Sequence, residues 1–332
     1  MSWIENDFEK KIKEKLYTQF DEIKGDEYYV RYKEVRNKLI KDIYPENAAA
    51  APNLSRHDPS HIADVMNSIH RVIGDKYGYL TGMDLYFLGL IVLFHDSGII
   101  KGRKEHHVRS RIKHIYDSMQ TEDRARYKQE RRLVLRAASA HSSSGKEGRD
   151  ADTMQPLPVN DGIDGNDVKV REMAVLLRFA DELSEGPHRT SLYKLNNGLY
   201  DEESKIYHQY ASITHVHIDR GSNSIKLTYN IDFKDNNSLR ELLEFTYERI
   251  HKLDQERKFA RHYSTICDVF KETKVVINIE HGEGELTIDN CTLTDLVIPG
   301  DSHKPLQELF RDYDIDQIIA KINSEQRSLE NA

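Results

Sequence analysis

The sequence has little cysteine and no long apolar segment, and both shortages exclude classes of protein. Its only two cysteines are Cys267 and Cys291, which argues against a disulfide framework or a zinc site built from thiolates. The longest apolar run, Leu85–Phe94, is about half of the ~20 residues that a membrane span needs. The first residues also lack a basic segment followed by an apolar one, the pattern of a secretory signal. We therefore expect a cytoplasmic protein with no membrane partner.

Positive charge is also in deficit. The chain has 48 lysines and arginines against 56 aspartates and glutamates, a formal net charge of -8. This negative net charge argues against a large nucleic-acid-binding surface, although a local basic groove is compatible with a negative total. Since both cysteines lie outside every motif below, a metal site here must use histidines and carboxylates. The sixteen histidines supply candidates, and their positions decide which of them matter.

Apolar periodicity predicts a mostly α protein with a smaller α/β (α+β) region appended at its C-terminal end. Helices are expected over 2–43 as a pair, 61–73, 82–94, about 105–119, 133–140 and 168–183, with a connecting loop over 45–59 and a surface loop over 142–167. Beyond Tyr210 the period becomes that of strands, and we expect a hairpin over 213–231, strands over 274–280 and 285–299, and helices over 238–270 and 305–323. We place a helical domain at 1–204 and an α+β domain at 205–332, the latter for regulation, recognition or oligomerisation.

Four residues stand out because helix patterns place them on an inward face or at a helix end. His61 shares a face with Val65 and Ile69, and the apolar helix stops at His95 and Asp96. Asp181 continues the apolar face of the helix over 168–183. Two imidazoles and two carboxylates suit Mn, Fe, Ni, Zn or Mg and not soft copper. The alternatives are a helix-capping pair at 95–96 and an ordinary buried histidine at 61.

These motifs resemble those of the HD-domain superfamily of metal-dependent phosphohydrolases, over about residues 50 to 190. His61 matches the first histidine of the superfamily, His95 and Asp96 match its paired motif, and Asp181 matches its last aspartate. The resemblance implies a helical core in which these four residues hold a divalent metal.

A subset of the superfamily has further histidines that bind a second metal. His106 and His141 resemble these, with His107 as the alternative to His106. A surface-loop role is the alternative for both positions. The expected cofactor is thus a divalent metal, one or two ions of Mn, Fe, Ni, Co, Zn or Mg, and with two ions Asp96 would bridge them.

The reaction implied by the resemblance is attack of metal-activated water on phosphorus. The substrate would be a phosphoester of a nucleotide, cyclic nucleotide or nucleic acid, and the choice between monoester and diester stays open. Candidates to contact phosphate are Lys101, Arg109, Lys146 and Arg189. Many members that cleave cyclic dinucleotides carry a lysine where this chain has Ile99, and a Gly-Tyr-Pro motif that this chain lacks. Cyclic-di-GMP specificity is therefore not expected.

Two other expectations concern partners and remaining histidines. The alternative function is a catalytically silent sensor or scaffold that binds a nucleotide on an HD core, and a homo-oligomer is left open. His57 is expected as a plain loop residue, with a role beside the metal or substrate as the alternative. His215 and His217 alternate along a strand, where an exposed face is favoured over a metal site.

Overall fold

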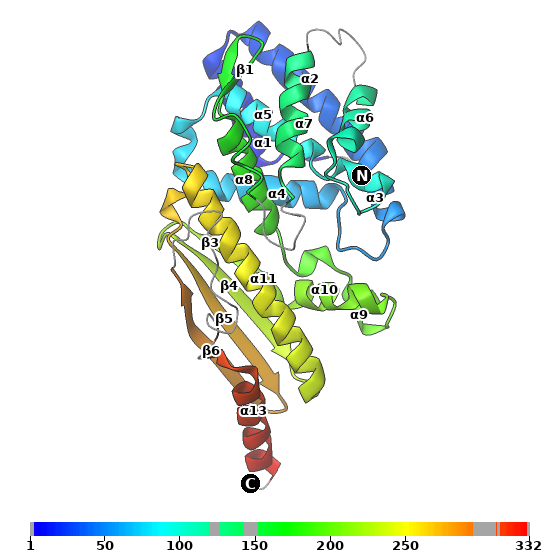
Figure 1. Ribbon diagram of the computed structural model, residues 1–332, viewed down its shortest axis with the longest axis vertical. Helices are drawn as coiled ribbons and strands as arrows, with labels where there is room; N and C mark the ends of the chain where they lie inside the picture. Colours follow the sequence, from blue (N-terminus) through cyan, green and yellow to red (C-terminus); the bar gives the residue numbers. More distant parts are fainter. Residues whose placement is uncertain (1–2, 120–126, 143–151, 295–309, 311–312, 331–332) are drawn as a thin grey trace. The chain divides into compact units, whose positions relative to one another are not determined.

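The computed structural model describes residues 3–119, 127–142, 152–294, 310 and 313–330 (Figure 1). Within them the chain is mostly helical with a small mixed sheet toward its C-terminal end, which confirms the predicted fold class. The chain forms two compact units, Met1–Ser184 with Ala260–Asp268, and Glu185–Phe259 with Val269–Ala332. The division into independent domains at residue 204 stays a prediction.

The first unit is built around α5 (Gly82–Phe94), an apolar helix in which every residue is buried. Its start is fixed by a capping box, in which Thr81 accepts from the Asp84 N–H and the Asp84 carboxylate accepts from the Thr81 N–H. The segment Gly82–Lys101 is long and apolar enough to cross a membrane, but 94% of its apolar window is buried inside the protein. That burial fits the core helix of a soluble protein. The helices packed on α5 are α1 (Asp7–Gln19), α2 (Glu22–Lys38), α4 (Pro59–Ile73), α7 (Lys128–Ser139) and α8 (Val170–Glu182).

The helix α4 has clear start and stop signals. The Asp58 carboxylate accepts from the Ser60 N–H at the N-cap, and Pro59 occupies the first turn, where its missing N–H costs nothing. Gly74 ends the helix with a φ of 54°, a left-handed conformation that favours glycine. The apolar face of α4 therefore reaches the core with His61 in its first turn.

Several expected boundaries are wrong, including those of the helices expected over 133–140, 238–270 and 305–323, which are Lys128–Ser139, Asn236–Tyr263 and Ile315–Glu330 in the structure. The predicted loop over 45–59 contains a helix, α3 (Tyr44–Ala50), which continues α2 through a π-helical turn, η1 (Leu39–Ile43). Pro45 is compatible with the first turn of α3, and the alanines after it are strong helix formers. The helix expected from about residue 105 begins later, as α6 (Arg109–Met119). Glu105 has a φ of 60°, which interrupts a right-handed helix.

A buried polar network ties four of the helices together. Glu130 on α7 pairs with Arg31 on α2 at 2.6 Å, and Tyr86 on α5 donates to it at 2.8 Å. Tyr116 on α6 donates to the same carboxylate. The charge of Glu130 is thereby paired and hydrogen-bonded, as a buried carboxylate requires.

Further elements lie between these helices and the strands of the second unit. They are η2 (Gly74–Tyr79), η3 (Ser97–Lys101), a two-stranded sheet of β1 (Asp161–Ile163) and β2 (Asn166–Val168) inside the expected surface loop, η4 (Pro187–Arg189), α9 (Leu192–Asn196), α10 (Glu202–Ile213) and η5 (Cys267–Val269).

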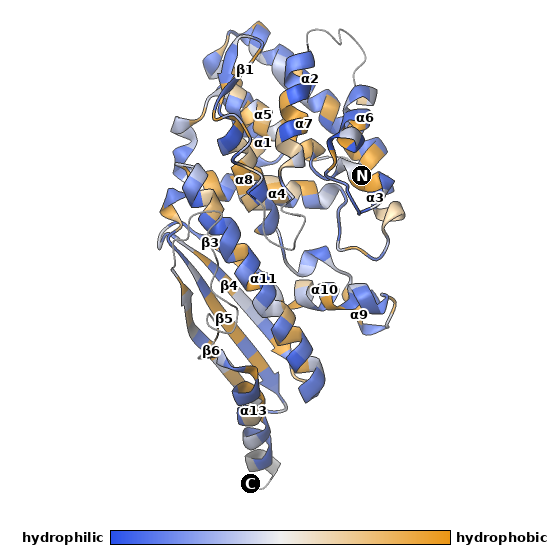
Figure 2. Ribbon diagram, in the orientation of Figure 1, coloured by the Kyte–Doolittle hydropathy of each residue, from blue (hydrophilic) through white to orange (hydrophobic). Residues whose placement is uncertain are grey.

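The second unit contains a four-stranded sheet in the order β3 (Thr214–Asp219), β4 (Ser224–Asp232), β5 (Glu272–His281) and β6 (Gly284–Leu293). The β3–β4 hairpin is antiparallel as predicted, β4 and β5 are parallel, and β5 and β6 are antiparallel. Apolar and polar residues alternate along β5 (Figure 2), because one face of the strand is buried.

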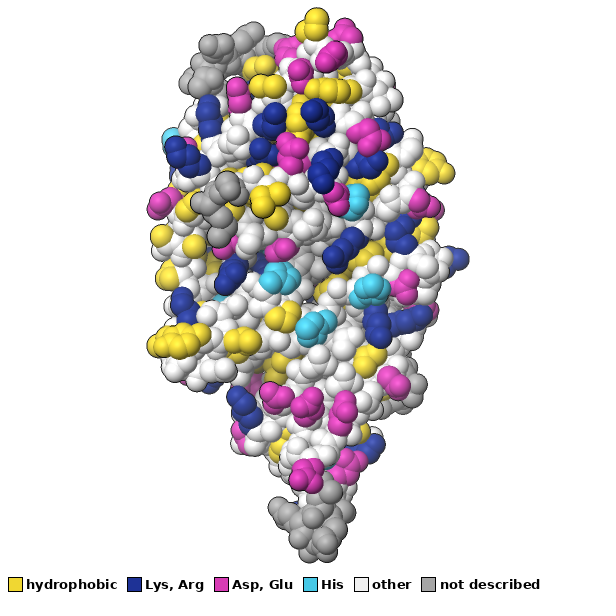
Figure 3. Space-filling view, turned by 180° about the vertical axis from the view of Figure 1, so that it is seen from behind, with side chains coloured by type: hydrophobic (Ala, Val, Ile, Leu, Met, Phe, Trp, Pro, Cys, Tyr) yellow, Lys and Arg dark blue, Asp and Glu magenta, His cyan; other side chains and the backbone are white. Residues whose placement is uncertain are grey.

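The helix α11 (Asn236–Tyr263) joins β4 to β5, since parallel neighbours need a crossover connection. The fully buried Arg257 of this helix bonds to Thr273 and to the backbone oxygen of Leu293, which fixes α11 to the sheet. The helix α13 (Ile315–Glu330) follows β6. On the molecular face in Figure 3, acidic and basic side chains are interspersed, as the 31% content of charged residues leads one to expect.

Candidate metal centre

Three packed helices deliver the first set of candidate ligands. His61 lies in the first turn of α4, His95 and Asp96 follow α5, and Asp181 lies in the last turn of α8. Nε2 of His61 is 3.1 Å from Oδ1 of Asp181, and Nε2 of His95 is 3.2 Å from Oδ2 of Asp96. The cross distances are 3.5 Å from His61 to Asp96 and 3.8 Å from His95 to Asp181. The four residues that the sequence singles out thus meet at one point.

The imidazole rings of His61 and His95 are buried at this point. Nδ1 of His95 lies 2.8 Å from the Val92 carbonyl oxygen, and donation there directs the lone pair of Nε2 toward the carboxylates. Within the described part of the chain, Nε2 of His61 and Nε2 of His95 have no hydrogen-bond partner. Two ligand atoms about 2.1 Å from a shared ion lie roughly 3.0 to 3.4 Å apart. The spacing of these atoms therefore fits a divalent ion between them.

A second group lies on the other side of Asp96. Nε2 of His106 and Nε2 of His141 are 3.5 and 3.7 Å from Oδ1 of Asp96, and 3.2 Å from each other. Their Nδ1 atoms lie 2.9 Å from the Arg103 oxygen and 2.6 Å from the Ala138 oxygen. Donation through Nδ1 leaves both Nε2 lone pairs pointing into the same space. Two such lone pairs repel unless a proton or a cation lies between them.

Asp96 stands between the two groups with one oxygen toward each. Its Oδ2 faces His61 and His95, and its Oδ1 faces His106 and His141. The Asn47 amide donates to the Asp96 backbone oxygen at 3.1 Å, so α3 helps to hold the residue in place. Each group of three, His61–His95–Asp181 and Asp96–His106–His141, offers ligand atoms within 4.8 Å of one another.

The electrostatics keep the carboxylates charged. Burial favours the neutral acid at Asp96, but His95 and His57 outweigh it and hold the pKa of Asp96 well below 3.8. Burial likewise opposes the charge of Asp181, and the neighbouring His61 and His95 still lower the pKa of that carboxyl. Both side chains are thus ionised at neutral pH, which is the form that binds a cation.

The imidazoles differ from one another. Burial, with the charge of His95 adding to it, lowers the pKa of His141 to about 3, so this ring is neutral at pH 7. Burial also disfavours the charged form of His95, but Asp96 and Asp181 outweigh it and raise the pKa of His95 to about 9. Binding of a divalent ion at His95 therefore requires the loss of a proton.

His57 is a member of the cluster that the sequence did not favour. Its Nδ1 is 2.8 Å from Oδ2 of Asp96, and together with His61 and Asp96 it forms a third potential ligand group. The expectation of a plain loop residue is therefore wrong. The available signal was its position four residues before His61, but Asp58 and Pro59 start α4 after His57, so helix periodicity could not orient its ring.

The other candidates are more scattered. Lys101 is exposed at the end of η3, and Arg109 is exposed at the start of α6, where its Nε donates to the Ser139 hydroxyl at 3.3 Å. Arg189 is buried in the second unit, with Nη1 4.0 Å from Oε2 of Glu185. Lys146 lies outside the described residues.

Three other histidines that the sequence singles out are not candidate ligands in the structure: His107, whose ring centroid lies 5.4 Å from that of His106, and His215 and His217 on β3. His107 belongs to none of the groups found among the described residues. His215 and His217 are exposed on β3, as expected.

Comparison with known proteins gives one family. A family model described as HD-CE matches residues 51–258, more than half of the chain. No curated protein and no solved structure matches the chain. The matched range contains all seven histidines and aspartates of the cluster. An HD-like domain with a buried histidine–aspartate cluster fits a metal-dependent hydrolase.

Proposed function

The chain belongs to the HD-CE family, and on this basis we propose that it is a metal-dependent phosphohydrolase. Its substrate would be a phosphoester of a nucleotide, cyclic nucleotide or nucleic acid. Cytoplasmic localisation and a regulatory, recognition or oligomerisation role for residues 205–332 belong to the same proposal.

One observation carries the proposal. Two buried imidazole nitrogens, Nε2 of His61 and Nε2 of His95, have no hydrogen-bond partner among the described residues and converge with the oxygens of Asp96 and Asp181. An unsatisfied buried nitrogen costs about 1–3 kcal/mol. A divalent cation held by all four side chains would satisfy Nε2 of His61 and, once its proton is lost, Nε2 of His95, and it would neutralise both carboxylates.

We further propose that the centre holds two ions, of Mn, Fe, Ni, Co, Zn or Mg. His61, His95 and Asp181 would hold one, His106 and His141 the other, and Asp96 would bridge them through its two oxygens. When bound, such ions lower the pKa of water and stabilise the charge on phosphoryl oxygens.

The protein groups around the ions would position them and the substrate. His57, at 2.8 Å from Asp96 Oδ2, would hold the bridging carboxylate in its orientation, as groups beside metal ligands commonly do. Arg109, exposed three residues after His106, is our candidate to bind a phosphate oxygen. Lys101 and Arg189 are proposed for the same role.

The experiment measures metal content and hydrolysis on the same samples. Purified protein is analysed for metals, then incubated with bis-p-nitrophenyl phosphate and p-nitrophenyl phosphate in Mn, Ni, Co, Mg or Zn. His95→Ala and Asp96→Ala should each lose metal and at least about 100-fold in rate. His114→Ala, which changes an exposed histidine on α6 outside the ligand groups, should keep both.

Two outcomes would reject the proposal. Unchanged hydrolysis in His95→Ala and Asp96→Ala would exclude the cluster as the catalytic site. Metal bound with no hydrolysis of either ester or of nucleotides would favour the silent sensor. The preferred ester of an active protein would separate diesterase from monoesterase activity.

A further inference from the structure

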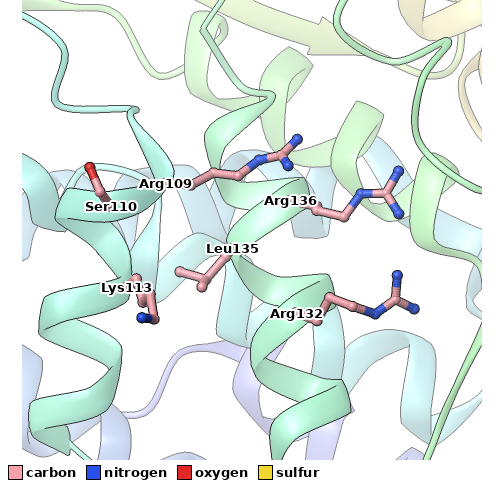
Figure 4. A pocket seen from close by; sticks show the side chains of 6 residues that line it. All are labelled: Arg109, Ser110, Lys113, Arg132, Leu135 and Arg136. Carbon is pink, nitrogen blue, oxygen red and sulfur yellow. The ribbon is translucent and has the colours of Figure 1, made fainter.

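A groove between α6 and α7 is lined by basic side chains. Its volume is about 600 Å³, and its lining residues are Arg109, Ser110, Lys113, Arg132, Leu135 and Arg136. Figure 4 shows Lys113 on α6, Arg109 extending from α6 toward α7, and Arg132 and Arg136 extending from α7. The basic residues form two i, i+4 pairs, so each pair lies on one face of its helix.

The charge of the groove is only partly neutralised by the protein. Arg132 pairs with Asp161 at 2.7 Å, and Arg136 donates to the neutral Pro156 backbone oxygen at 2.8 Å. Arg109 donates to the neutral Ser139 hydroxyl, and Lys113 is exposed. Among the described residues, the four cationic side chains that line the groove have one carboxylate partner, Asp161, in a chain whose net charge is -8. This excess of positive charge makes the groove a site for a polyanion.

One end of the groove lies next to the second ligand group. The contact between Arg109 and Ser139, 3.3 Å from Nε to Oγ, joins the start of α6 to the end of α7. His106 precedes Arg109 by three residues, and His141 follows Ser139 by two. An extended anion that contacts Arg109 can therefore continue along the groove from the candidate metal centre.

We propose that this groove binds the phosphodiester backbone of a single nucleic-acid strand, and that it leads the strand to the metal centre. Delivery of the strand to the metal centre rests on the proposed phosphohydrolase function, whereas binding of the strand in the groove does not. Within each pair the two residues are about 6 Å apart along the helix axis, a spacing close to that of neighbouring phosphates in an extended strand.

The lining favours a strand over a mononucleotide. It contains no aromatic ring on which a nucleobase could stack, so the specific contacts that its charged side chains can offer are to phosphates. Contacts through phosphate alone bind without sequence preference and depend on salt.

Fluorescence anisotropy tests the binding step without catalysis. A labelled oligothymidylate of about twelve nucleotides is titrated with the full chain in EDTA, which prevents metal-dependent cleavage. With three to four phosphates neutralised, affinity should fall about 20- to 50-fold between roughly 50 and 200 mM salt. Lys113→Gln should weaken binding about three- to fivefold and reduce the salt dependence, and Lys113→Glu should weaken it further.

A control variant and two competing ligands, ATP and inorganic polyphosphate, test whether the groove binds a nucleic-acid strand. Lys13→Gln removes the same charge from an exposed position on α1 and should leave binding unchanged. Lack of binding, equal binding by Lys113→Glu and Lys13→Gln, or binding independent of salt would each overturn the proposal. Binding of ATP as tight as that of the oligothymidylate would indicate a nucleotide site. Tight binding of inorganic polyphosphate by a protein that does not bind the oligothymidylate would indicate a polyphosphate site. Either outcome would overturn the proposal. Strand binding by a protein that hydrolyses no ester would keep the groove and reject the phosphohydrolase.

Discussion

The close contact between Gly98 and His106 offers a selective way to disturb the second ligand group. A Cβ added at Gly98 would lie 2.0 Å from the backbone oxygen of His106, and contacts below 3.0 Å are essentially never seen. Gly98→Ala must therefore move the two segments apart by at least 1.0 Å, the difference between these distances. His61 and Asp181 lie on other helices, and His95 is held at the buried end of α5, so these three should keep their places.

The expected result of Gly98→Ala is a large loss of activity with a smaller loss of stability. A displacement of about 1 Å at a catalytic group can cost roughly 100-fold in rate. Overpacking costs about 1–3 kcal/mol, which for a unit of this size lowers Tm by about 2 to 12 °C. Elemental analysis should find about one ion lost per chain, because His106 moves relative to Asp96.

The control for this variant is Gly78→Ala, since a Cβ at Gly78 meets nothing within 4 Å. It should leave metal content, activity and Tm near those of the wild type. Wild-type metal content and activity in Gly98→Ala would refute the role of the contact in placing His106.

Two further predictions concern stability. Glu130→Ala leaves the Arg31 guanidinium, which is 14% exposed, without its carboxylate, and should lower the free energy of unfolding in urea by about 3–5 kcal/mol. Glu14→Ala removes an exposed pair with Lys11 and should lower it by less than about 1 kcal/mol. Equal losses in the two variants would contradict the role of the buried pair. The pKa of His95 is raised from 6.5 to about 9, so the folded state binds this proton more tightly than the unfolded state. With a chelator present, the stability from this group should be complete below pH 6.5 and lost as the pH rises toward 9. His95→Gln should lack this decline, and equal slopes in both proteins would argue against the assigned shift.

Helix periodicity singled out the residues of the first ligand set in the sequence, and the resemblance to HD domains placed them in one site. His61, Asp96 and Asp181 occupy inward or terminal positions on long amphipathic or apolar helices, where a period of 3.6 residues specifies the face. The end of α5 could also be predicted, because its apolar run stops at His95. The strands over β4 and β5 were predicted for a similar reason, since their period of two is distinct from that of a helix; the parallel pairing between them was not predicted.

Features that depend on tertiary contacts could not be predicted in this way. His57 precedes the N-cap of α4, so only its contact with Asp96 shows that it belongs to the cluster. The start of α6 depends on the left-handed backbone conformation of Glu105, which a glutamate rarely adopts and which the sequence therefore does not predict. α3 was mistaken for a loop because Pro45 is compatible with both structures.

The basic groove shows the same limit for charge. In the sequence, Lys113 and Arg136 are ordinary surface residues of two amphipathic helices. They line one groove only because α6 packs on α7, which the buried contacts of Tyr116 and Glu130 help to fix. A net charge of -8 thus conceals a local positive surface.

The most direct test of the central claim is anomalous scattering from crystals of the protein grown with Mn²⁺. The account predicts two peaks about 3.5 to 4 Å apart, on either side of the Asp96 carboxylate, one beside His61, His95 and Asp181 and the other beside His106 and His141. Both peaks should vanish in Asp96→Asn. Peaks elsewhere in the molecule, or none at this cluster, would contradict it.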